Sequence, residues 1–482
     1  MSWVYLPNIN YKIIFKFLIL TFSFFASLFV FGQDSIDLLI KKHEIPESKL
    51  SIILEDNESG KRLIDINSNR SRSPGSVTKL FTAFAAIDLL GSQYQWKTEA
   101  YIDQKDNGKD SIDYLLIRGG GDPSFSINDL ESFILKIRAT GIREIRNGIH
   151  LDQSFFKQRK KSTGSFDQSP LRPYNTMHSS LIVNSNKLDL SFRFNSKTKE
   201  IVVTPSFLPK GVSIQNNLLI GSGDCKDFRS QVNFKERLEG KTIMILINGF
   251  YPVQCPNFDH DLAITETEHY FYGAFKKIWM DSGGIINGHY KRRKKSKMNA
   301  LIAHMDSEEL NSILRLTLKE SDNLASRNVF LSFAEKTNQT KLRNTRKAVY
   351  KSMKNNDVQW HNRNFIENGS GLSRKTRLKP ESIMGLLKKI DQETKFLEIK
   401  SMLPVSGIDG TLKNIYQSSL LQGQMRLKTG TLNGVRCLAG FITSKSGKEY
   451  RFVFMHNNYE EYGYDLRSFT TDLLNIIVTD QY

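Results

Sequence analysis

The chain has 482 residues, of which 39% are hydrophobic and 11% aromatic, as is ordinary for a protein with buried cores. At about 150 residues per domain, this length corresponds to about three domains. The formal net charge of +18 favours anionic partners through a long-range field. Two basic clusters stand out, at residues 157–161 and 291–295, but neither carries the interleaved aromatics or recognition motif of a nucleic-acid-binding protein. We expect no nucleic acid as partner and solvated loops at both clusters, with attraction to anionic polymers or lipid headgroups as the alternative.

The N-terminus has the pattern of a secretory signal. Lys12 and Lys16 precede an apolar run at 17–31, and residues 30–32 are suited to cleavage before Gln33. The run is shorter than the about 18 residues that a membrane span requires, so cleavage is favoured over an uncleaved anchor. We therefore expect residues 1–32 to be a signal peptide and the mature protein to be exported, in the periplasm or elsewhere in the cell envelope. A peripheral association with the membrane remains open.

Three cysteines are too few for a disulfide scaffold. Cys225 and Cys255 lie in one region of the chain, and an exported location permits them to pair. A closed loop of about thirty residues would stabilise the fold by roughly 3–4 kcal/mol on the chain-entropy model. Cys437 would then remain as a buried thiol on a strand.

The first predicted elements are two strands and a helix. Two strand-like runs within residues 50–67 flank a hairpin turn at 57–60. A Ser/Arg/Pro-rich segment, 68–75, leads into a helix whose apolar residues recur at helical spacing until Gly91 supplies a stop. From 96 to 290 the pattern changes to short strands separated by Gly, Asn and Pro.

The C-terminal third returns to long helices and strands. Helical periodicity covers 307–333, and an amphipathic helix is predicted over 465–478. Between them, adjacent strands are predicted at 424–432, 435–443 and 449–456, with a strong hairpin signal at Asn433-Gly434.

This order of elements predicts an α+β fold in which strands from both ends of the chain form one antiparallel sheet flanked by helices. A large β-rich insertion splits this unit. We expect a first catalytic part at 33–96, the inserted domain or domains at 97–298, and a second catalytic part at 299–482.

Three short clusters could carry chemistry. Ser76 and Lys79 begin the first long helix, and a spacing of three residues puts them on one helix face. A serine hydroxyl needs a neighbouring group to take its proton, and a lysine can do so if burial or nearby cations hold its amine neutral. Taken alone, this pair is more often a helix cap followed by an exposed lysine.

The other two clusters are Ser321-Asp322-Asn323, in the returning helical region, and Lys428-Thr429-Gly430-Thr431, on a predicted strand. The former could be a helix cap or turn, and the latter a solvent-facing lysine beside a bulge. Each is weak singly, but all three in this order form the signature of penicillin-binding proteins and class A β-lactamases.

The flanking sequence narrows the resemblance to one branch. About 240 residues separate the first two clusters, far more than compact β-lactamases insert. The chain resembles the penicillin-binding protein 4 type of D-alanyl-D-alanine carboxypeptidase/endopeptidase, peptidase family S13. The resembling stretches, besides the three clusters, are 119–123, 148–156, 173–174 with Asn184 and Asn186, 319–324, 368–374, 403–407, 409–412 and 457–458. The chain departs from the family at Pro74-Gly75, where Pro-Ala is more common, and in its extra basic residues after Phe156 and before Met298.

The resemblance implies a fold of the penicillin-binding/β-lactamase-like transpeptidase class and an acyl-enzyme mechanism. Ser76 would attack the carbonyl between the two terminal D-alanines, and Lys79 would take its proton. Ser321 would pass a proton to the leaving amine, and Asn323 would hydrogen-bond the substrate's peptide group.

The strand cluster would recognise the substrate. The charge of Lys428 would attract the C-terminal carboxylate and keep Lys79 neutral, and the hydroxyls of Thr429 and Thr431 would bond that carboxylate. Gly430 would let the strand approach closely. The backbone N–H groups of Ser76 and Thr431 would form the oxyanion hole, at about 3 kcal/mol per donor.

Further expectations concern partners and specificity. The partners would be peptidoglycan stem peptides, with β-lactams as covalent inhibitors, and no metal or other cofactor is expected. Asp152 could pair with the free amine of a diaminopimelate branch, although a turn-capping aspartate is the slightly favoured alternative. Whether the enzyme prefers carboxypeptidase or endopeptidase substrates stays open.

Two other functions compete with this one. A β-lactamase would need a glutamate followed four residues on by an asparagine, which is absent between Asn323 and Lys428. A non-catalytic penicillin-sensing or wall-binding protein would have lost catalytic side chains, and here all are present.

Overall fold

The computed structural model describes residues 31–156, 163–333, 342–458 and 465–482. The expected signal peptide falls almost wholly outside these residues, as does the basic cluster at 157–161. Among the described helices, none combines the length and apolar character that crossing a membrane requires.

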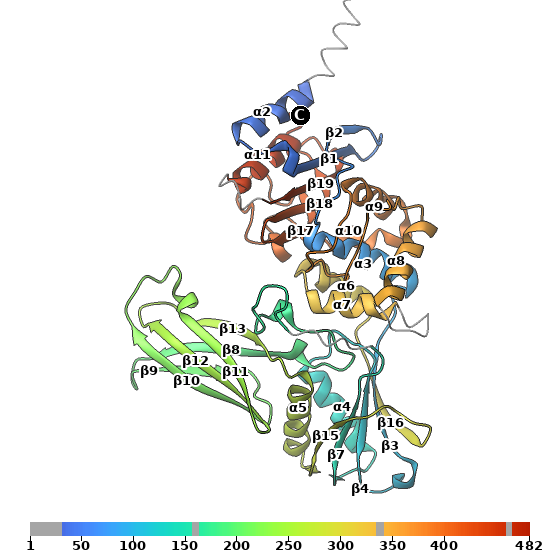
Figure 1. Ribbon diagram of the computed structural model, residues 1–482, viewed down its shortest axis with the longest axis vertical. Coiled ribbons are helices and arrows are strands. Elements are labelled where there is room, and N and C mark those ends of the chain that lie inside the picture. The colour runs from blue at the N-terminus through green and yellow to red at the C-terminus, as the bar shows by residue number, and fades with distance from the viewer. Residues whose placement is uncertain (1–30, 157–162, 334–341, 459–464) are drawn as a thin grey trace, which may run out of the picture.

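A five-stranded antiparallel sheet joins the two ends of the chain. Its order is β17-β18-β19-β1-β2, so the N-terminal hairpin continues the C-terminal meander (Figure 1). The strands are β1 (Leu50–Asp56), β2 (Arg62–Ile66), β17 (Met425–Leu432), β18 (Val435–Thr443) and β19 (Glu449–Asn457). This confirms the α+β fold, and each strand lies within a residue or so of its predicted position.

Alternating side chains bury both faces of this sheet. Ile52 and Leu54 join one core cluster, and Ile53, between them, joins another. The first face packs on α2 (Phe31–Lys42) and α11 (Leu466–Val478). The second is covered by a helical layer of α3 (Thr78–Leu89), α6 (Leu310–Lys319), α7 (Asn323–Ser332), α8 (Leu342–Asn355), α9 (Pro380–Gln392) and α10 (Glu398–Ser401).

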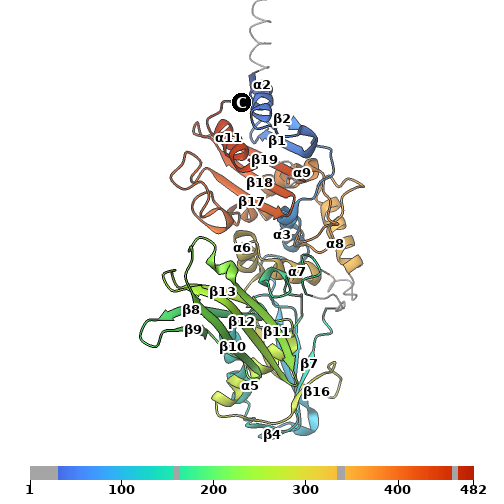
Figure 2. The same cartoon turned by 60° about the vertical axis from the view of Figure 1, so that its left-hand side comes forward.

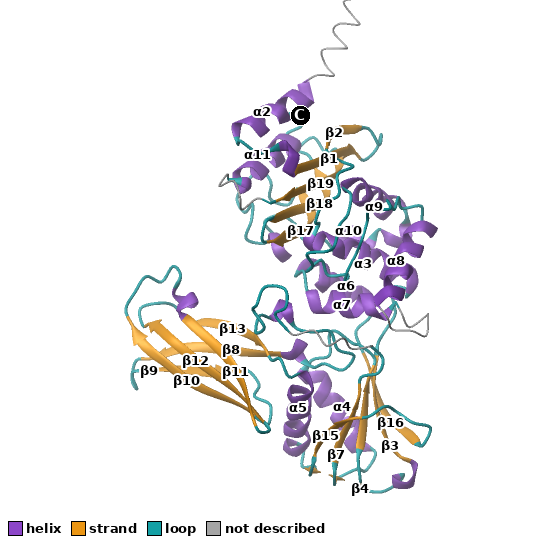
Figure 3. Ribbon diagram, viewed as in Figure 1, coloured by secondary structure: helices purple, strands orange, loops and turns teal. Residues whose placement is uncertain are grey.

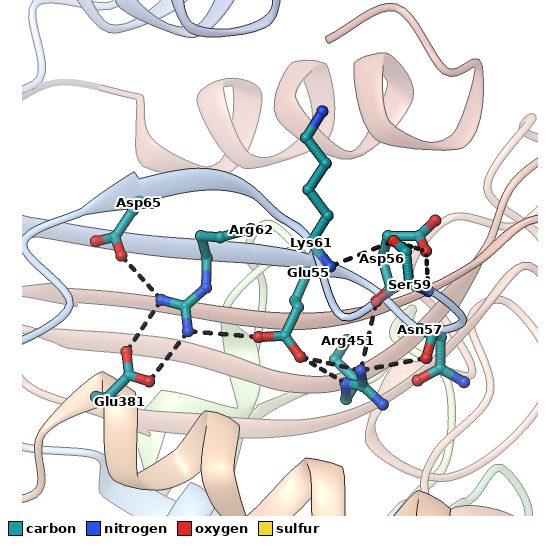
Figure 4. A network of polar contacts seen from close by, with 9 residues as sticks. All are labelled: Glu55, Asp56, Asn57, Ser59, Lys61, Arg62, Asp65, Glu381 and Arg451. Carbon is teal, nitrogen blue, oxygen red and sulfur yellow. Dashed lines mark hydrogen bonds and ion pairs between the residues drawn. The ribbon is translucent and has the colours of Figure 1, made fainter.

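A chain of ion pairs ties the sheet to this helical layer (Figure 4). Arg451 on β19, only 1% exposed, lies 2.9 Å from Glu55 on β1. Arg62 on β2 contacts Glu55 at 3.4 Å and Glu381 on α9 at 3.0 Å. Because a buried charge left without its partner is costly, these pairs oppose any slip in register between β19, β1 and β2.

The inserted region leaves and rejoins the sheet-and-helix unit on paired strands, β3 (Lys97–Asp103) and β16 (Asn299–Asp306). It contains a sheet of order β15-β7-β5-β3-β16 and three three-stranded sheets: β14-β6-β4, β13-β8-β9 and β10-β12-β11 (Figures 2 and 3). The remaining bounds are β4 (Ser111–Ile112), β5 (Leu115–Gly119), β6 (Glu144–Ile145), β7 (Gly148–Asp152), β8 (Lys187–Asn195), β9 (Glu200–Pro205), β10 (Val212–Gly221), β11 (Val232–Glu239), β12 (Thr242–Pro252), β13 (Phe258–Ala263), β14 (Ile285–Ile286) and β15 (His289–Arg292).

Two helices of this region were not predicted from the sequence, α4 (Ile127–Ala139) and α5 (Thr267–Asp281). Cys225 and Cys255 form a disulfide with a Cα–Cα distance of 5.2 Å, and Cys437 is a buried free thiol on β18. The domain boundaries at 96/97 and 298/299 stay predictions.

Candidate active site

Ser76 lies in a 3₁₀ turn, Gly75–Val77, that runs directly into α3. Gly75 has a φ of +51°, a conformation that L side chains rarely adopt, and its carbonyl accepts a hydrogen bond from the hydroxyl of Thr78 at 2.8 Å. The turn therefore has a fixed shape, and one helical turn further on Lys79 lies on the same face as Ser76.

Lys79 is completely buried, and its Nζ has three polar neighbours. Nζ lies 2.9 Å from Oγ of Ser76, 2.7 Å from Oδ1 of Asn323 and 2.7 Å from the carbonyl oxygen of Ser370. Burial, and then the charge of Lys428, lowers the pKa of Lys79 well below its ordinary value. A neutral amine has two N–H groups and one lone pair. The two carbonyl-type oxygens can accept the N–H groups, which leaves the lone pair for the Ser76 hydroxyl.

Ser321 lies at the break between α6 and α7 and has a φ of +60°. A non-glycine residue in this region is strained by about 1–2 kcal/mol, so surrounding contacts must hold it there. On the α7 side, the Asp322 side chain caps the helix by accepting from the N–H of Ala325 at 2.8 Å. On the α6 side, Nζ of Lys319 donates to Asp409 at 2.5 Å and to the carbonyl of Leu403 at 2.7 Å.

Lys428 on β17 joins the second and third clusters. Its Nζ donates to Oγ of Ser321 at 2.8 Å and to the carbonyl of Thr429 at 3.0 Å. The side chain is completely buried, and burial lowers the pKa of Lys428 to about 7. The three clusters predicted from the sequence therefore meet at one place, through Lys79–Asn323 and Lys428–Ser321.

Two glycines allow the backbone segments to meet at Ser76. A Cβ on Gly430 would lie 2.4 Å from the carbonyl oxygen of Pro74 and 3.1 Å from the nitrogen of Ser76. A Cβ on Gly371, whose φ is +81°, would lie 1.9 Å from the carbonyl oxygen of Gly75. β17 thus passes directly beside the Ser76 turn, as an oxyanion hole made from the backbones of Ser76 and Thr431 requires.

A cleft of about 510 Å³ opens over Ser76. Ser321, Asn323 and Thr431 line it, together with residues to which the sequence analysis gave no role: Phe166, Asp167, Tyr174, Leu372, Leu432, Asn433, Arg374 and Arg436. Tyr174, Leu372 and Arg374 lie in stretches that carry the family resemblance, and that resemblance could have identified them as site residues from the sequence. Asp167 lies in no such stretch.

The inserted region supplies one wall of this cleft. Buried Arg327 on α7 donates to the carbonyls of Thr176 at 2.8 Å and Tyr174 at 3.2 Å. Oδ2 of Asp167 accepts from the Tyr174 hydroxyl at 2.7 Å, and such hydrogen bonds outweigh burial and lower the pKa of Asp167. Its carboxylate is therefore charged at neutral pH.

Asp152 is placed elsewhere, at the end of β7, and does not line this cleft. Its carboxylate, in a side chain 2% exposed, accepts from the backbone N–H of Ser154 at 2.9 Å and of Lys295 at 2.7 Å. These contacts agree with the capping alternative.

The basic cluster at 291–295 begins on β15, where Arg292 pairs with Glu268 at 2.5 Å. Within the described residues, no three or more His, Cys, Asp or Glu side chains lie close enough together to bind a metal ion.

Comparison with known proteins decides the family. The model of the D-Ala-D-Ala carboxypeptidase 3 (S13) family matches residues 33–472. The chain belongs to this family. It is therefore a serine peptidase of the D-alanyl-D-alanine carboxypeptidase type, and the family expected from the sequence is confirmed.

Similar proteins cover nearly the whole chain. The D-alanyl-D-alanine carboxypeptidase DacB of Haemophilus influenzae is 24% identical over 443 residues, 90% of each chain. A D-alanyl-D-alanine carboxypeptidase of Actinomadura sp. is 22% identical, over 89% of this chain and 81% of its own. Penicillin binding protein 4 of Haemophilus influenzae has a similar fold, with a TM-score of 0.77, 23% identity, and coverage of 92% of this chain and 99% of that one. A second structure of that protein, with a TM-score of 0.72, is a complex with a β-lactam.

Proposed function

We propose that the chain cuts D-alanyl peptides of peptidoglycan with Ser76 as the nucleophile and Lys79 as its base. The observation that carries this assignment is the environment of the Lys79 amine. It is fully buried, its pKa is lowered, and Asn323 and Ser370 accept its two N–H groups. Its lone pair then faces the Ser76 hydroxyl, which is the geometry that a general base needs.

In the acylation step, Oγ of Ser76 bonds to the carbonyl carbon of the penultimate D-alanine while its proton passes to Lys79. The tetrahedral oxyanion is stabilised by the N–H groups of Ser76 and Thr431. The carbon–nitrogen bond then breaks, and the leaving amine takes up the proton that Lys79 received, passed on through the hydroxyl of Ser321, to which Lys428 donates a hydrogen bond. Water next attacks the ester carbonyl and gives a proton to the neutral Lys79. Lys79 returns this proton to Oγ of Ser76 as the ester carbon–oxygen bond breaks, which releases the acyl product and the free serine.

Substrate recognition would be divided between residues of β17, beside the cleft, and residues on the cleft wall. Lys428, Thr429 and Thr431 would hold the C-terminal carboxylate, whose negative charge would raise the lowered pKa of Lys428 and keep its amine protonated. Asp167 and Arg374, of opposite charge on the cleft wall, would meet polar groups on the side-chain branch of the stem peptide, in the role that the sequence analysis gave to Asp152.

Labelling with fluorescent penicillin tests the nucleophile. A β-lactam should acylate the wild-type protein, and Ser76→Ala should not be labelled. Ser73→Ala, three residues earlier, is a matched control that should label normally. Hydrolysis of a pentapeptide ending in D-Ala-D-Ala should follow the same pattern, which excludes a non-catalytic sensor. Normal labelling of Ser76→Ala would refute the assignment.

We further propose that the protein is exported, with cleavage before Gln33, and acts in the periplasm or cell envelope. The pattern of Lys12, Lys16 and the apolar run at 17–31 supports this. N-terminal sequencing of the protein recovered from an envelope fraction should begin at Gln33. An intact Met1 in a membrane pellet would instead indicate an uncleaved anchor.

A further inference from the structure

Residues 293–298, which we name the strap, connect β15 to β16, the two edge strands of the sheet β15-β7-β5-β3-β16. At its start, the N–H of Arg293 donates to the carbonyl of Leu151 on β7 at 3.1 Å. At its end, the carbonyl of Met298 accepts from the N–H of Gln104, directly after β3, at 3.0 Å. The strap therefore passes across the sheet from one edge to the other and is fastened to it by backbone hydrogen bonds.

Lys295 holds the middle of the strap. Its N–H donates to the carboxylate of Asp152 at 2.7 Å, and its Nζ donates to the hydroxyl of Tyr101 at 3.0 Å. The same Nζ lies 4.3 Å from the centre of the Tyr101 ring. Ala100 and Ile102, on either side of Tyr101, belong to the core of the inserted region, so Tyr101 lies on the opposite, outer face of the sheet. The strap covers this outer face.

The strap and the end of β15 carry an excess of positive charge. Six of the seven residues at 291–297 are basic, and all seven are exposed. Within the part of the chain that the structure describes, only Arg292 among these six forms an ion pair, with Glu268. The neighbouring segment 103–113 adds four carboxylates, but two of them are already paired with cations, namely Asp106 with Lys109 and Asp113 with Lys105. The strap therefore presents cations to the solvent.

Apolar side chains are exposed among these charges. Met298, the last residue of the strap, is 61% exposed, and Leu301 on β16 is 51% exposed. Leu301 is the cross-strand partner of Tyr101, so it lies on the outer face that the strap covers. Cations beside exposed apolar side chains are typical of a surface that enters a lipid interface, where the charges meet phosphates and the apolar groups meet acyl chains. A soluble polyanion would satisfy the charges alone.

We propose that the strap docks the protein on an anionic lipid membrane. β7 and β16, which flank the strap, lie in the opposite half of the molecule from β17 and α3, which carry catalytic residues (Figures 1 and 2). Contact through the strap therefore holds the enzyme at a membrane and leaves the catalytic cleft free for wall peptides. This role goes beyond the proposed function and does not depend on the assignment of Ser76.

Sedimentation with lipid vesicles tests the proposal. The protein used is the chain from Gln33 onward, because the apolar run at 17–31 would itself insert into lipid. One set of vesicles is phosphatidylcholine alone, and the other is an equal mixture of phosphatidylcholine and phosphatidylglycerol. We expect binding to the anionic vesicles to be at least about tenfold tighter and to weaken as salt is added.

Two variants each remove three positive charges from exposed side chains. The strap variant is Arg293→Gln/Lys294→Gln/Lys297→Gln, which keeps every backbone bond that fastens the strap. The matched control is Lys226→Gln/Lys235→Gln/Lys241→Gln, on β11 and the segments before and after it. A basic residue at an anionic membrane is worth about fivefold in affinity. We expect the strap variant to bind anionic vesicles at least about thirtyfold more weakly and the control less than about threefold more weakly.

Met298→Ser/Leu301→Ser distinguishes a lipid surface from a soluble polyanion. We expect it to bind anionic vesicles at least about fivefold more weakly and soluble polyphosphate as the wild type does. An unchanged vesicle affinity in this variant or in the strap variant, or an equal fall in the control, overturns the proposal. A wild-type protein that binds polyphosphate but not vesicles also overturns it and indicates a polyanion site.

An unchanged urea midpoint and normal penicillin labelling show that each variant is folded. A wild-type protein that binds anionic vesicles but is not labelled by penicillin refutes the proposed function and leaves the docking surface standing.

Discussion

Replacing Lys428 with methionine should abolish activity and make the protein more stable at neutral pH. The amine is completely buried, and its pKa of about 7 lies well below the ordinary value of 10.5. Between these two values the unfolded chain binds more protons than the folded one. Stability therefore falls as pH decreases from about 10.5 to about 7, and this loss is complete below pH 7.

The magnitude follows from the two pKa values. A difference of about 3.5 units at 1.36 kcal/mol each amounts to a cost of about 5 kcal/mol at and below pH 7. Methionine is similar in length and carries no charge. It also removes the hydrogen bonds to Ser321 and Thr429, which are worth about 1 kcal/mol each. The net expectation is a gain of about 2–3 kcal/mol at pH 7, which disappears by pH 10.

Urea unfolding of the wild-type protein and of Lys428→Met, at pH 7 and at pH 10, measures this difference. Lys413→Met, at an exposed lysine, is the control and should change stability little at either pH. Hydrolysis of the D-Ala-D-Ala pentapeptide should be lost only in Lys428→Met. Two results would refute this reasoning: a Lys428→Met protein no more stable than the wild type at pH 7, or one stabilised as much at pH 10 as at pH 7. Either would show that burying the Lys428 amine does not lower the stability of the protein.

Three other changes probe the remaining contacts. Gly371→Ala should slow penicillin acylation at least about tenfold, because the added Cβ would displace the turn that carries Ser76. Gly447→Ala is the control for backbone strain alone, since Gly447 has a similar φ of +87° and nothing lies within 4 Å of where its Cβ would be. Cys225→Ser should lower the urea midpoint of the inserted region, with a loss of about 3 kcal/mol, while penicillin labelling continues. Asp152→Asn should lower the free energy of unfolding by about 1–2 kcal/mol, because it weakens the hydrogen bonds to Ser154 and Lys295. The ratio of kcat/KM for a peptide with a free branch amine to kcat/KM for one without it should not change. A selective loss on the amine-bearing peptide would show that Asp152 recognises the substrate.

Local sequence determined the elements on which the catalytic residues lie. The helical spacing after Ser76 and the alternation around Asn433-Gly434 depend on side chains a few residues apart, and α3, β17 and β18 formed as predicted. The three clusters could also be found from local sequence, since each is a short run of residues that can be recognised without knowing the fold.

What the sequence could not supply were relations between distant segments. The φ of +60° at Ser321 depends on contacts such as that of Lys319 with Asp409, ninety residues later, and no local pattern encodes that pairing. Asp167 joins the cleft because the inserted region packs against α7, which composition alone does not reveal.

The tertiary structure also decided the chemistry at each lysine. A lysine three residues after a serine is usually an exposed, protonated side chain. Lys79 and Lys428 are both completely buried, and desolvation together with their mutual repulsion lowers the pKa of Lys79. The sequence determined which groups are present, and only folding put the two amines in a water-excluded site where one of them can act as a base.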